Sequence, residues 1–319
     1  MGRDNLGAET TADEVLDSID LDGRLAVITG AASGLGKETA RAMAAKGAHI
    51  VIPARDLEKG ESAAAEIKTA TGNDHIEVFE MELGSMASVR SFADAFLEKH
   101  DRIDLLINNA GVMACPYAET RDGLEMQFGT NHIGHFLMTN LLMPAVLRGN
   151  SPRIVNLSSR GHHRDEVHFD DLNFKNRDYE KWEAYGQAKT ANVQFSVGLE
   201  KRLADKGVHA YAVHPGGIVT NLGRHLSEAD VAELMARMKE SSGEGAMLKS
   251  VEAGAATTCF AATAPELEGK GGVYLEDCHI ADVNDDDPTG SVRSYAVDPA
   301  KAEALWSVSE EIVGQKFSY

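Results

Sequence analysis

The sequence has little that would cross-link it, attract nucleic acid or hold it in a membrane. Its 319 residues include only three cysteines, which have neither the paired spacing of a zinc site nor the even number of a disulfide framework. The net charge of -19 disfavours nucleic acid and anionic membrane surfaces as partners. No apolar run is long enough to span a bilayer, and the first residues lack the pattern of a targeting segment. We therefore expect a cytoplasmic protein with no membrane anchor, no nucleic-acid partner and no metal.

A glycine-rich stretch, residues 29–36 (TGAASGLG), joins an apolar strand candidate to a helix candidate. The run 25–28 before it is typical of a strand buried in a parallel sheet, and Leu35, Thr39 and Met43 after it recur at helical spacing. Small residues in such a turn let backbone N–H groups approach an anion at the positive end of the helix dipole. The turn therefore predicts a dinucleotide pyrophosphate site, although a tight strand-to-helix turn also needs small residues for steric reasons alone.

Apolar runs and helical patterns alternate after this turn, which predicts βαβ units with right-handed crossovers. The expected fold is a single α/β domain, residues 21–319, built on a doubly wound parallel sheet with helices on both faces. Residues 1–20 are expected to form an arm with a short helix, begun by a capping box at Thr11 and Glu14. The predicted strands are 25–28, 49–54, 75–79, 103–107, 153–157 and 209–213, and the predicted helices include 57–69 and 85–99. A substrate lid is expected at about 221–250 and a C-terminal extension at about 276–319.

In a doubly wound sheet the ligand binds at the carboxyl ends of the strands, so functional residues should follow each apolar run. The residues found there are Arg55 after the second run, Glu82 and Leu83 after the third, the turn Asn109 Ala110 Gly111 after the fourth, Ser159 at the end of the fifth, and Pro215 Gly216 after the sixth. Two helix candidates add Asn131 and the pair Tyr185 and Lys189, one helical turn apart.

Taken together, these motifs resemble the short-chain dehydrogenase/reductase family over roughly residues 21–274. A narrower likeness to its retinol-dehydrogenase-like branch rests on 54–60, 131–136, 158–163, 214–216 and Leu305 Trp306. The resemblance implies a Rossmann-type fold, a nicotinamide cofactor, a small hydrophobic alcohol or carbonyl substrate, and a homodimer or homotetramer. Two positions depart from the family: Glu82 stands where Asp is usual, which still permits a hydrogen bond to adenine, and the acidic N-terminus lacks the apolar anchor usual in animal members of the branch.

Interconversion of an alcohol and a ketone or aldehyde moves a hydride at the nicotinamide and a proton at the oxygen, and the protein must supply the proton. Tyr185 is the expected general acid/base. Its ordinary pKa of about 10 is too high for a base near neutral pH, so the cation of Lys189 is expected to lower it. Ser159 can orient the substrate oxygen. The resemblance implies further that Lys189 holds the nicotinamide ribose and that Asn131 anchors a water of a proton relay.

The end of the second strand decides between the two nicotinamide cofactors. An NAD site usually has an acidic side chain there, whereas this sequence has Ala54 and then Arg55, whose guanidinium can pair with a 2′-phosphate. We therefore expect NADP(H) to be preferred and NAD(H) to be the alternative, unless a strand boundary two residues later brings Asp56 to the ribose. The predicted cofactor contacts are Gly30, Ser33, Gly34, Leu35, Gly36, Arg55, Glu82, Leu83, Asn109, Ala110, Gly111, Tyr185, Lys189, Pro215, Gly216, Ile218 and Thr220.

Other functions are open at this point. A catalytically idle nicotinamide-binding sensor would keep the glycine turn and lose the chemistry. An epimerase or dehydratase of the extended relatives would share Tyr185 and Lys189 but generally has a TGxxGxxG turn, and a serine hydrolase would need a GxSxG elbow, which the sequence lacks.

Three further clusters of residues give weaker indications of a functional site. The set His162, His163, His168, Asp170 and Asp171 lacks metal-ligand spacing and predicts a polar loop. Residues 282–293 resemble a calcium loop, but Asp287 and Arg293 stand where its glycine and glutamate should be. Val231, Leu234, Met235 and Met238 form an apolar helical stripe, which is either a core helix or a Met-rich lid over an apolar substrate.

Overall fold

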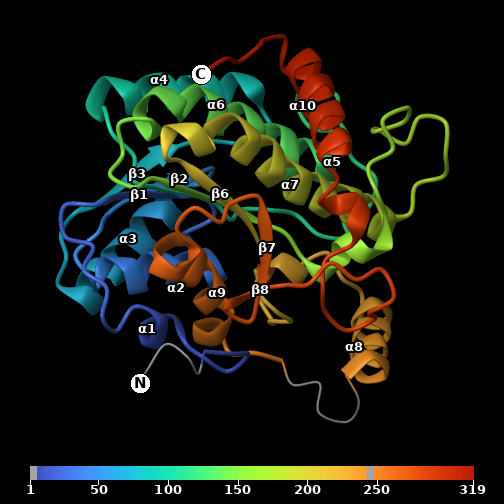
Figure 1. Cartoon of the computed structure of the whole chain (residues 1–319), viewed down its shortest axis with the longest axis horizontal. Coiled ribbons are helices and arrows are strands. Elements are labelled where there is room, and N and C mark those ends of the chain that lie inside the picture. Colours follow the sequence, from blue (N-terminus) through green and yellow to red (C-terminus); the bar gives the residue numbers. More distant parts are fainter. Residues whose placement is uncertain (1–5, 243–247) are drawn as a thin grey trace.

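The computed structural model describes residues 6–242 and 248–319 (Figure 1). Its centre is one eight-stranded sheet with the order β3-β2-β1-β4-β5-β6-β7-β8. The first seven strands pair in parallel, and β8 turns back to pair antiparallel with β7. The bounds are β1 Leu25–Ile28, β2 His49–Ala54, β3 Ile76–Glu80, β4 Leu105–Asn108, β5 Arg153–Leu157, β6 His209–His214, β7 Val273–Glu276 and β8 His279–Ile280. The predicted doubly wound fold is confirmed, and β7 and the edge strand β8 were not among the predicted strands.

Two layers of helices cover the sheet, one on each face (Figure 1). One layer contains α1 Ala12–Val15, α2 Gly34–Ala44, α3 Leu57–Thr71 and α9 Val251–Thr263. The other contains α4 Met86–Lys99, α6 Gly134–Val146, α7 Lys181–Leu203 and α10 Pro299–Val313. The short α5 Met126–Phe128 leads through a π-helical turn, Gly129–Ile133, into α6, and α8 Glu228–Ser242 follows β6. Within the described ranges, no helix combines the length and apolarity needed to cross a bilayer.

Burial from both sides explains why the central strands are continuous apolar runs. Every residue of β1, β4, β5 and β6 is buried, as expected for parallel strands between two helix layers. The predicted bounds of β2 are confirmed, whereas β3 and β4 begin later than predicted. The predicted capping box of the short N-terminal helix is also confirmed: Oγ1 of Thr11 accepts from the N–H of Glu14 at 3.3 Å, and the Glu14 carboxylate accepts from the N–H of Thr11 at 2.8 Å.

Candidate active site

The glycine turn between β1 and α2 is folded against Asn109, which follows β4. A Cβ atom at position 36 would lie 2.6 Å from the main-chain oxygen of Gly30, and one at position 30 would lie 2.8 Å from Nδ2 of Asn109. Gly30 and Gly34 both have a positive φ, of 70° and 55°, which side chains other than glycine rarely adopt. Two of the predicted glycines therefore serve close packing of the turn itself, whereas a Cβ atom at Gly34 would meet Thr220, at 3.5 Å.

Thr29, the residue before the turn, ties the ends of β1 and β4 together. Its Oγ1 accepts from the backbone N–H groups of Asn109 and Ala110, each at 2.9 Å. Nδ2 of Asn109 donates to the main-chain oxygen of Thr29 at 2.7 Å. Thr29 is fully buried, so these bonds are shielded from water and fix the two turns relative to each other. Thr29 is the first residue of the glycine-rich stretch but is not among the predicted site residues, because a threonine at a strand end can have many purely structural roles.

Asn131 lies on the π-helical turn and is fully buried. Its side-chain oxygen accepts from the N–H of Val112 at 2.8 Å, and its Nδ2 donates to the oxygen of the same residue at 2.9 Å. The side chain therefore clamps the segment that follows Gly111. π-Helical turns often occur at functional sites. No spacing in the sequence marked this turn.

Tyr185 and Ser159 meet beside the backbone of Gly161. A Cβ atom at position 161 would lie 2.7 Å from the Tyr185 ring and 3.3 Å from Oγ of Ser159, so only glycine leaves room for this approach. Ser159 hydrogen-bonds to the phenol, which lowers the pKa of Tyr185, but burial has the larger effect and raises that pKa to about 12. Oγ of Ser159 also accepts from the N–H of Gly161 at 3.0 Å.

Lys189 is buried behind Tyr185 on the same helix. Its Nζ lies 5.6 Å from the centre of the Tyr185 ring and donates to the main-chain oxygen of Leu157 at 2.8 Å. Burial lowers the pKa of Lys189 to about 8. Lys189 was expected to lower the pKa of Tyr185, but in the structure without a ligand that pKa is not lowered. The ammonium of Lys189 is directed at a carbonyl oxygen, and desolvation of the phenol has the larger effect.

Gly111 lies beside two of the predicted catalytic side chains, those of Asn131 and Lys189. A Cβ atom there would lie 3.0 Å from Oδ1 of Asn131 and 3.8 Å from Nζ of Lys189. The four predicted catalytic side chains thus converge from four places in the chain: the π-helical turn, the end of β5 and two positions on α7. Their meeting place is the carboxyl edge of β4 and β5, where the topology predicts a ligand.

The start of α2 has the features that a pyrophosphate needs. The side chain of Ser33 forms no cap hydrogen bond in the described structure, so backbone N–H groups of the first helical turn are available to an anion. Thr220 stands over this turn, 3.5 Å from the position of a Cβ at Gly34. Leu35 and Ile218 pack together against Gly254 of α9. The residues after β6 therefore cover the glycine turn, as the prediction of Ile218 and Thr220 requires.

A cavity of about 270 Å³ lies beside the ends of β2 and β3, lined by Arg55, Glu80, Glu82, Ser85, Ser88 and Arg121. Asp56 is occupied elsewhere: its carboxylate accepts from the N–H of Lys59 at 3.2 Å as the N-cap of α3. Glu82 pairs with Arg121 at 2.9 Å. The boundary at Ala54 leaves Arg55 as the exposed cation at the end of β2.

The remaining predicted contacts lie at the same edge of the sheet. Leu83 packs its backbone against Gly134, the first residue of α6. Pro215 follows β6, and Gly216 has a φ of 100° and lies against the side chain of Lys249.

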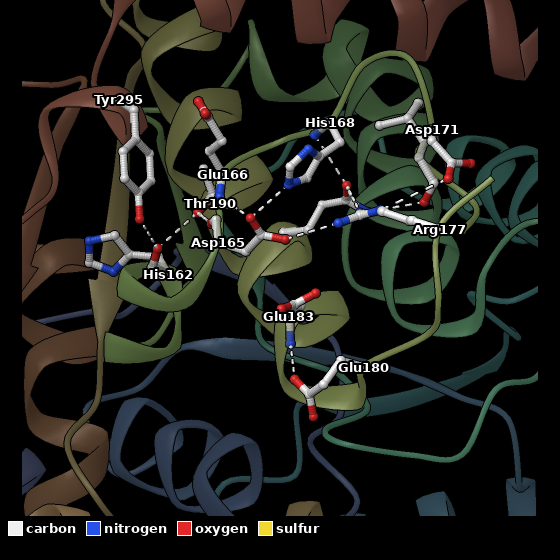
Figure 2. A network of polar contacts seen from close by, with 12 residues as sticks. His162, Asp165, Glu166, His168, Asp171, Arg177, Glu180, Glu183, Thr190 and Tyr295 are labelled. Atoms are coloured by element: carbon white, nitrogen blue, oxygen red, sulfur yellow. Dashed lines mark hydrogen bonds and ion pairs between the residues drawn. The ribbon is translucent and has the colours of Figure 1, made fainter. Parts of the chain in front are cut away.

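The polar segment after Ser159 is held by α7 and by the C-terminal extension (Figure 2). Nδ1 of His162 donates to the main-chain oxygen of Ser159 at 2.7 Å, and Nε2 accepts from the N–H of Arg293 at 3.2 Å. The main-chain oxygen of His162 accepts from the hydroxyls of Tyr295, at 2.6 Å, and Thr190, at 3.2 Å. The loop that follows Ser159, a predicted catalytic residue, is therefore supported by residues more than 130 positions later.

The histidines and aspartates of this segment have structural partners. The carboxylate of Asp165 lies 2.7 Å from Nε2 of His168 and 3.2 Å from Arg177, as Figure 2 shows. Nε2 of His163 lies 3.1 Å from the main-chain oxygen of Ser291. These contacts agree with the predicted polar loop.

Helix α8 and the segment just before it place apolar side chains near Tyr185. Leu226 and Leu234 pack with Met113 and Trp182 around the tyrosine, and Nζ of Lys181 pairs with Asp230 at 2.5 Å. Val231 and Met235 are 45% and 44% exposed, so this stripe is not a core face. The side chain of Met238 lies outside the described residues.

Comparisons with known proteins agree with this geometry. A family model described as short chain dehydrogenase matches residues 24–231. The mouse protein retinol dehydrogenase 12 is 41% identical and covers 93% of this chain and 88% of its own length. A solved structure of an uncharacterised protein from Mycobacterium paratuberculosis has a TM-score of 0.72 at 34% identity, over 96% of this chain and 98% of that one. The Pseudomonas aeruginosa RhlG/NADP active-site complex has a TM-score of 0.64 at 25% identity, over 80% and 95%.

Proposed function

The chain belongs to the short-chain dehydrogenase/reductase family, and on that premise we propose that it is an NADP-preferring oxidoreductase that interconverts a hydrophobic alcohol with its ketone or aldehyde. Tyr185 is the proposed general acid/base. One observation carries the proposal: the phenol of Tyr185 and the hydroxyl of Ser159 meet beside Gly161 at the carboxyl edge of the sheet. The bound nicotinamide would supply the hydride donor or acceptor.

Tyr185 and Ser159 have different roles in the proposed proton transfer. During alcohol oxidation, deprotonated Tyr185 takes the hydroxyl proton while Ser159 donates a hydrogen bond to the substrate oxygen; during carbonyl reduction, the protonated phenol returns that proton. Lys189 and Asn131 adjoin Gly111 behind the phenol. There Lys189 can bind the ribose hydroxyls and its positive charge favours the phenolate. The clamp of Asn131 on Val112 keeps this wall of the site rigid.

The proposed preference for NADP rests on Arg55. It is exposed at the end of β2 and lines the cavity there, where its guanidinium can form two charge-assisted bonds to a 2′-phosphate. Asp56, which would repel that phosphate, is engaged as the helix cap of α3. A similar structure at 25% identity is described as an NADP complex, which supports the proposal.

The proposed substrate is apolar because the side chains around the phenol are. Leu226, Leu234, Met113 and Trp182 surround Tyr185, and the partly exposed Val231 and Met235 extend the apolar surface of α8. We propose that α8 is a lid that closes on the substrate. A relative is named a retinol dehydrogenase, which also favours a hydrophobic alcohol or aldehyde.

A substrate panel tests the function directly. Hydrophobic primary and secondary alcohols and their carbonyl partners are supplied with NADP(H) or NAD(H), and the nicotinamide absorbance is followed. Turnover of at least one pair, with Tyr185→Phe as the inactive control, is the expected result. Tight binding of the cofactor with no turnover across the panel would instead identify a nicotinamide-binding sensor.

We also propose a cellular compartment and an oligomeric state. All three cysteines are buried and free, which suits a reducing compartment such as the cytoplasm. We also propose a homodimer or homotetramer, which sedimentation equilibrium would distinguish from a monomer by mass.

A further inference from the structure

Three side chains with metal-binding chemistry meet at the edge of the sheet opposite the active site. His49 is the first residue of β2, Glu77 is the second residue of β3, and His100 follows the last residue of α4. They come from the amino ends of two strands and the carboxyl end of a helix, far from the glycine turn. No metal was predicted from the sequence, and nothing in the sequence connects these residues, because they are separated by 28 and 23 positions.

The sheet register explains why they meet. Glu77 pairs with Val51 across β2 and β3, and His49 lies two residues before Val51, so alternation puts His49 and Glu77 on the same face. Val51 packs on this face with Phe96 of α4, so α4 covers it. The end of α4 then delivers His100 to the same point, where the ring centres of His49 and His100 are 5.4 Å apart.

The ligand atoms are already close to the spacing of a metal site. Nε2 of His49 lies 3.0 Å from one carboxylate oxygen of Glu77, and Nε2 of His100 lies 3.2 Å from the other. One ligand atom from each of the three residues lies within 4.8 Å of the other two. Ligands about 2.0–2.2 Å from a tetrahedral zinc ion are about 3.3 Å apart. Small side-chain rotations would therefore direct three ligand atoms at one ion.

The three side chains are enclosed but can be reached from solvent. Their exposed fractions are 27% for His49, 23% for Glu77 and 12% for His100. His49 and His100 line an open pocket of about 520 Å³, which leaves room for a water molecule as a fourth ligand. Nε2 of His49 is shielded from water, yet it has no well-aligned hydrogen bond among the described residues. A nitrogen in that state is suited to a metal ion.

The nearby cations do not prevent a divalent ion from binding. Arg24 and Arg102 of the same pocket lie 3.9 Å and 3.3 Å from the fully buried carboxylate of Asp104. Nζ of Lys99 lies 2.6 Å from a carboxylate oxygen of Glu77, but the Lys99 side chain is 58% exposed. An exposed ion pair of this kind contributes little free energy, so a metal can displace the ammonium into solvent.

We propose that His49, Glu77 and His100 form a zinc site that joins β2, β3 and the end of α4. Two imidazoles and one carboxylate are a donor set that binds Zn²⁺ well, whereas Mg²⁺ and Ca²⁺ prefer oxygen donors. The ion sits at the sheet edge away from Tyr185, so its role is structural: it stabilises the folded chain and leaves the chemistry of the active site unchanged. This inference does not depend on the proposed oxidoreductase activity.

Equilibrium dialysis of the full chain, after treatment with EDTA, tests the site with Zn²⁺ as the probe. The expected result is saturable binding of one zinc ion per chain, with Mg²⁺ unable to compete. His49→Gln and His100→Gln should each weaken binding at least about tenfold, whereas His279→Gln, which removes an exposed histidine of β8, should leave it unchanged. Lys99→Gln should tighten binding, because it frees the Glu77 carboxylate.

Thermal unfolding gives a second measurement on the same proteins. Zinc that binds the folded state should raise the Tm of the wild type in proportion to the logarithm of its concentration. The increase should be smaller in His49→Gln and His100→Gln. Binding without a defined stoichiometry would overturn the proposal, as would affinities in the two ligand variants equal to that of His279→Gln.

Discussion

Nδ1 of His135 lies 2.9 Å from the main-chain oxygen of Asn131, one turn back in α6 and its π-helical start. A carbonyl can only accept, so Nδ1 carries the proton; Nε2 then accepts from the hydroxyl of Thr29, also at 2.9 Å. Burial lowers the pKa of His135 to about 4, which keeps the ring neutral near pH 7. One neutral imidazole thus joins the end of the first strand to the turn that carries Asn131.

Replacing His135 by Phe should lower kcat more than it changes KM. The variant leaves the Thr29 hydroxyl and the Asn131 oxygen without this partner, at a cost of about 1–3 kcal/mol for a buried group. We expect kcat to fall about tenfold or more as these groups move. His132→Phe is the matched control: His132 is equally buried, but its Nε2 lies 2.8 Å from Ser309 of α10. His132→Phe is expected to lower Tm about as much as His135→Phe does, but to leave kcat unchanged. Equal kcat values in the two variants would show that His135 is not a positioning residue.

Tyr185→Phe should abolish most turnover while the protein stays folded. Only the oxygen that carries the proton is lost, and general acid–base groups contribute about 100- to 10,000-fold to rate. Steady-state kinetics measure the loss, and NADPH fluorescence with thermal unfolding shows whether binding and folding survive. Activity within tenfold of the wild type, in a folded variant, would disprove the assignment.

The rate of alcohol oxidation should rise with pH. The deprotonated phenol is the base, and in the chain alone burial raises the pKa of Tyr185 to about 12; the cation of Lys189 opposes this when the site is assembled with its ligands. Lys189→Met should therefore move the rising limb to higher pH. The pH profile of kcat at saturating cofactor provides the measurement, and an unchanged profile would exclude an electrostatic role for Lys189.

Arg55→Ala should reverse or abolish the preference for NADP. The guanidinium is the proposed partner of the 2′-phosphate, so kcat/KM for NADP should fall by about tenfold or more while the value for NAD changes little. Lys59→Ala is the control, because it removes a nearby cation that pairs with Asp56 at 3.0 Å. A wild type that prefers NAD would show that the end of β2 does not select the phosphate.

The lid hypothesis predicts that Met235→Ala raises KM for bulky apolar substrates without lowering Tm. Met235 is 44% exposed, so its loss leaves no core cavity, whereas a core methionine would cost about 2–5 kcal/mol. Kinetics with a short and a long aliphatic alcohol compare the two effects. A lower Tm with unchanged KM would show that the helix is packed as core in solution.

Local features of the fold were predictable because they depend on nearby residues. The alternation of apolar runs and helices indicated the parallel sheet, and the boundary of β2 at Ala54 followed from the apolar pattern alone. The capping box of Thr11 and Glu14 needs only a three-residue spacing. Candidate site residues could be chosen for the same reason: strand ends are visible in sequence.

Long-range contacts could not be predicted. The partnership of Thr29 with His135 spans 106 positions, and that of His162 with Arg293 spans 131. The pKa of Tyr185 could not be predicted from the sequence either. The four-residue spacing to Lys189 suggested that it is lowered, whereas burial raises it. Spacing shows which residues share a helix face, but not what solvent or carbonyl groups surround them.

The support of the Ser159 loop by Arg293 and Tyr295 also sets an order in time. A ribosome makes the four proposed catalytic residues well before it makes these two, so a nascent chain that ends near residue 290 contains Asn131, Ser159, Tyr185 and Lys189 without the contacts that hold His162. The contacts of this loop with Arg293 and Tyr295 can therefore form only after residue 295 has been made.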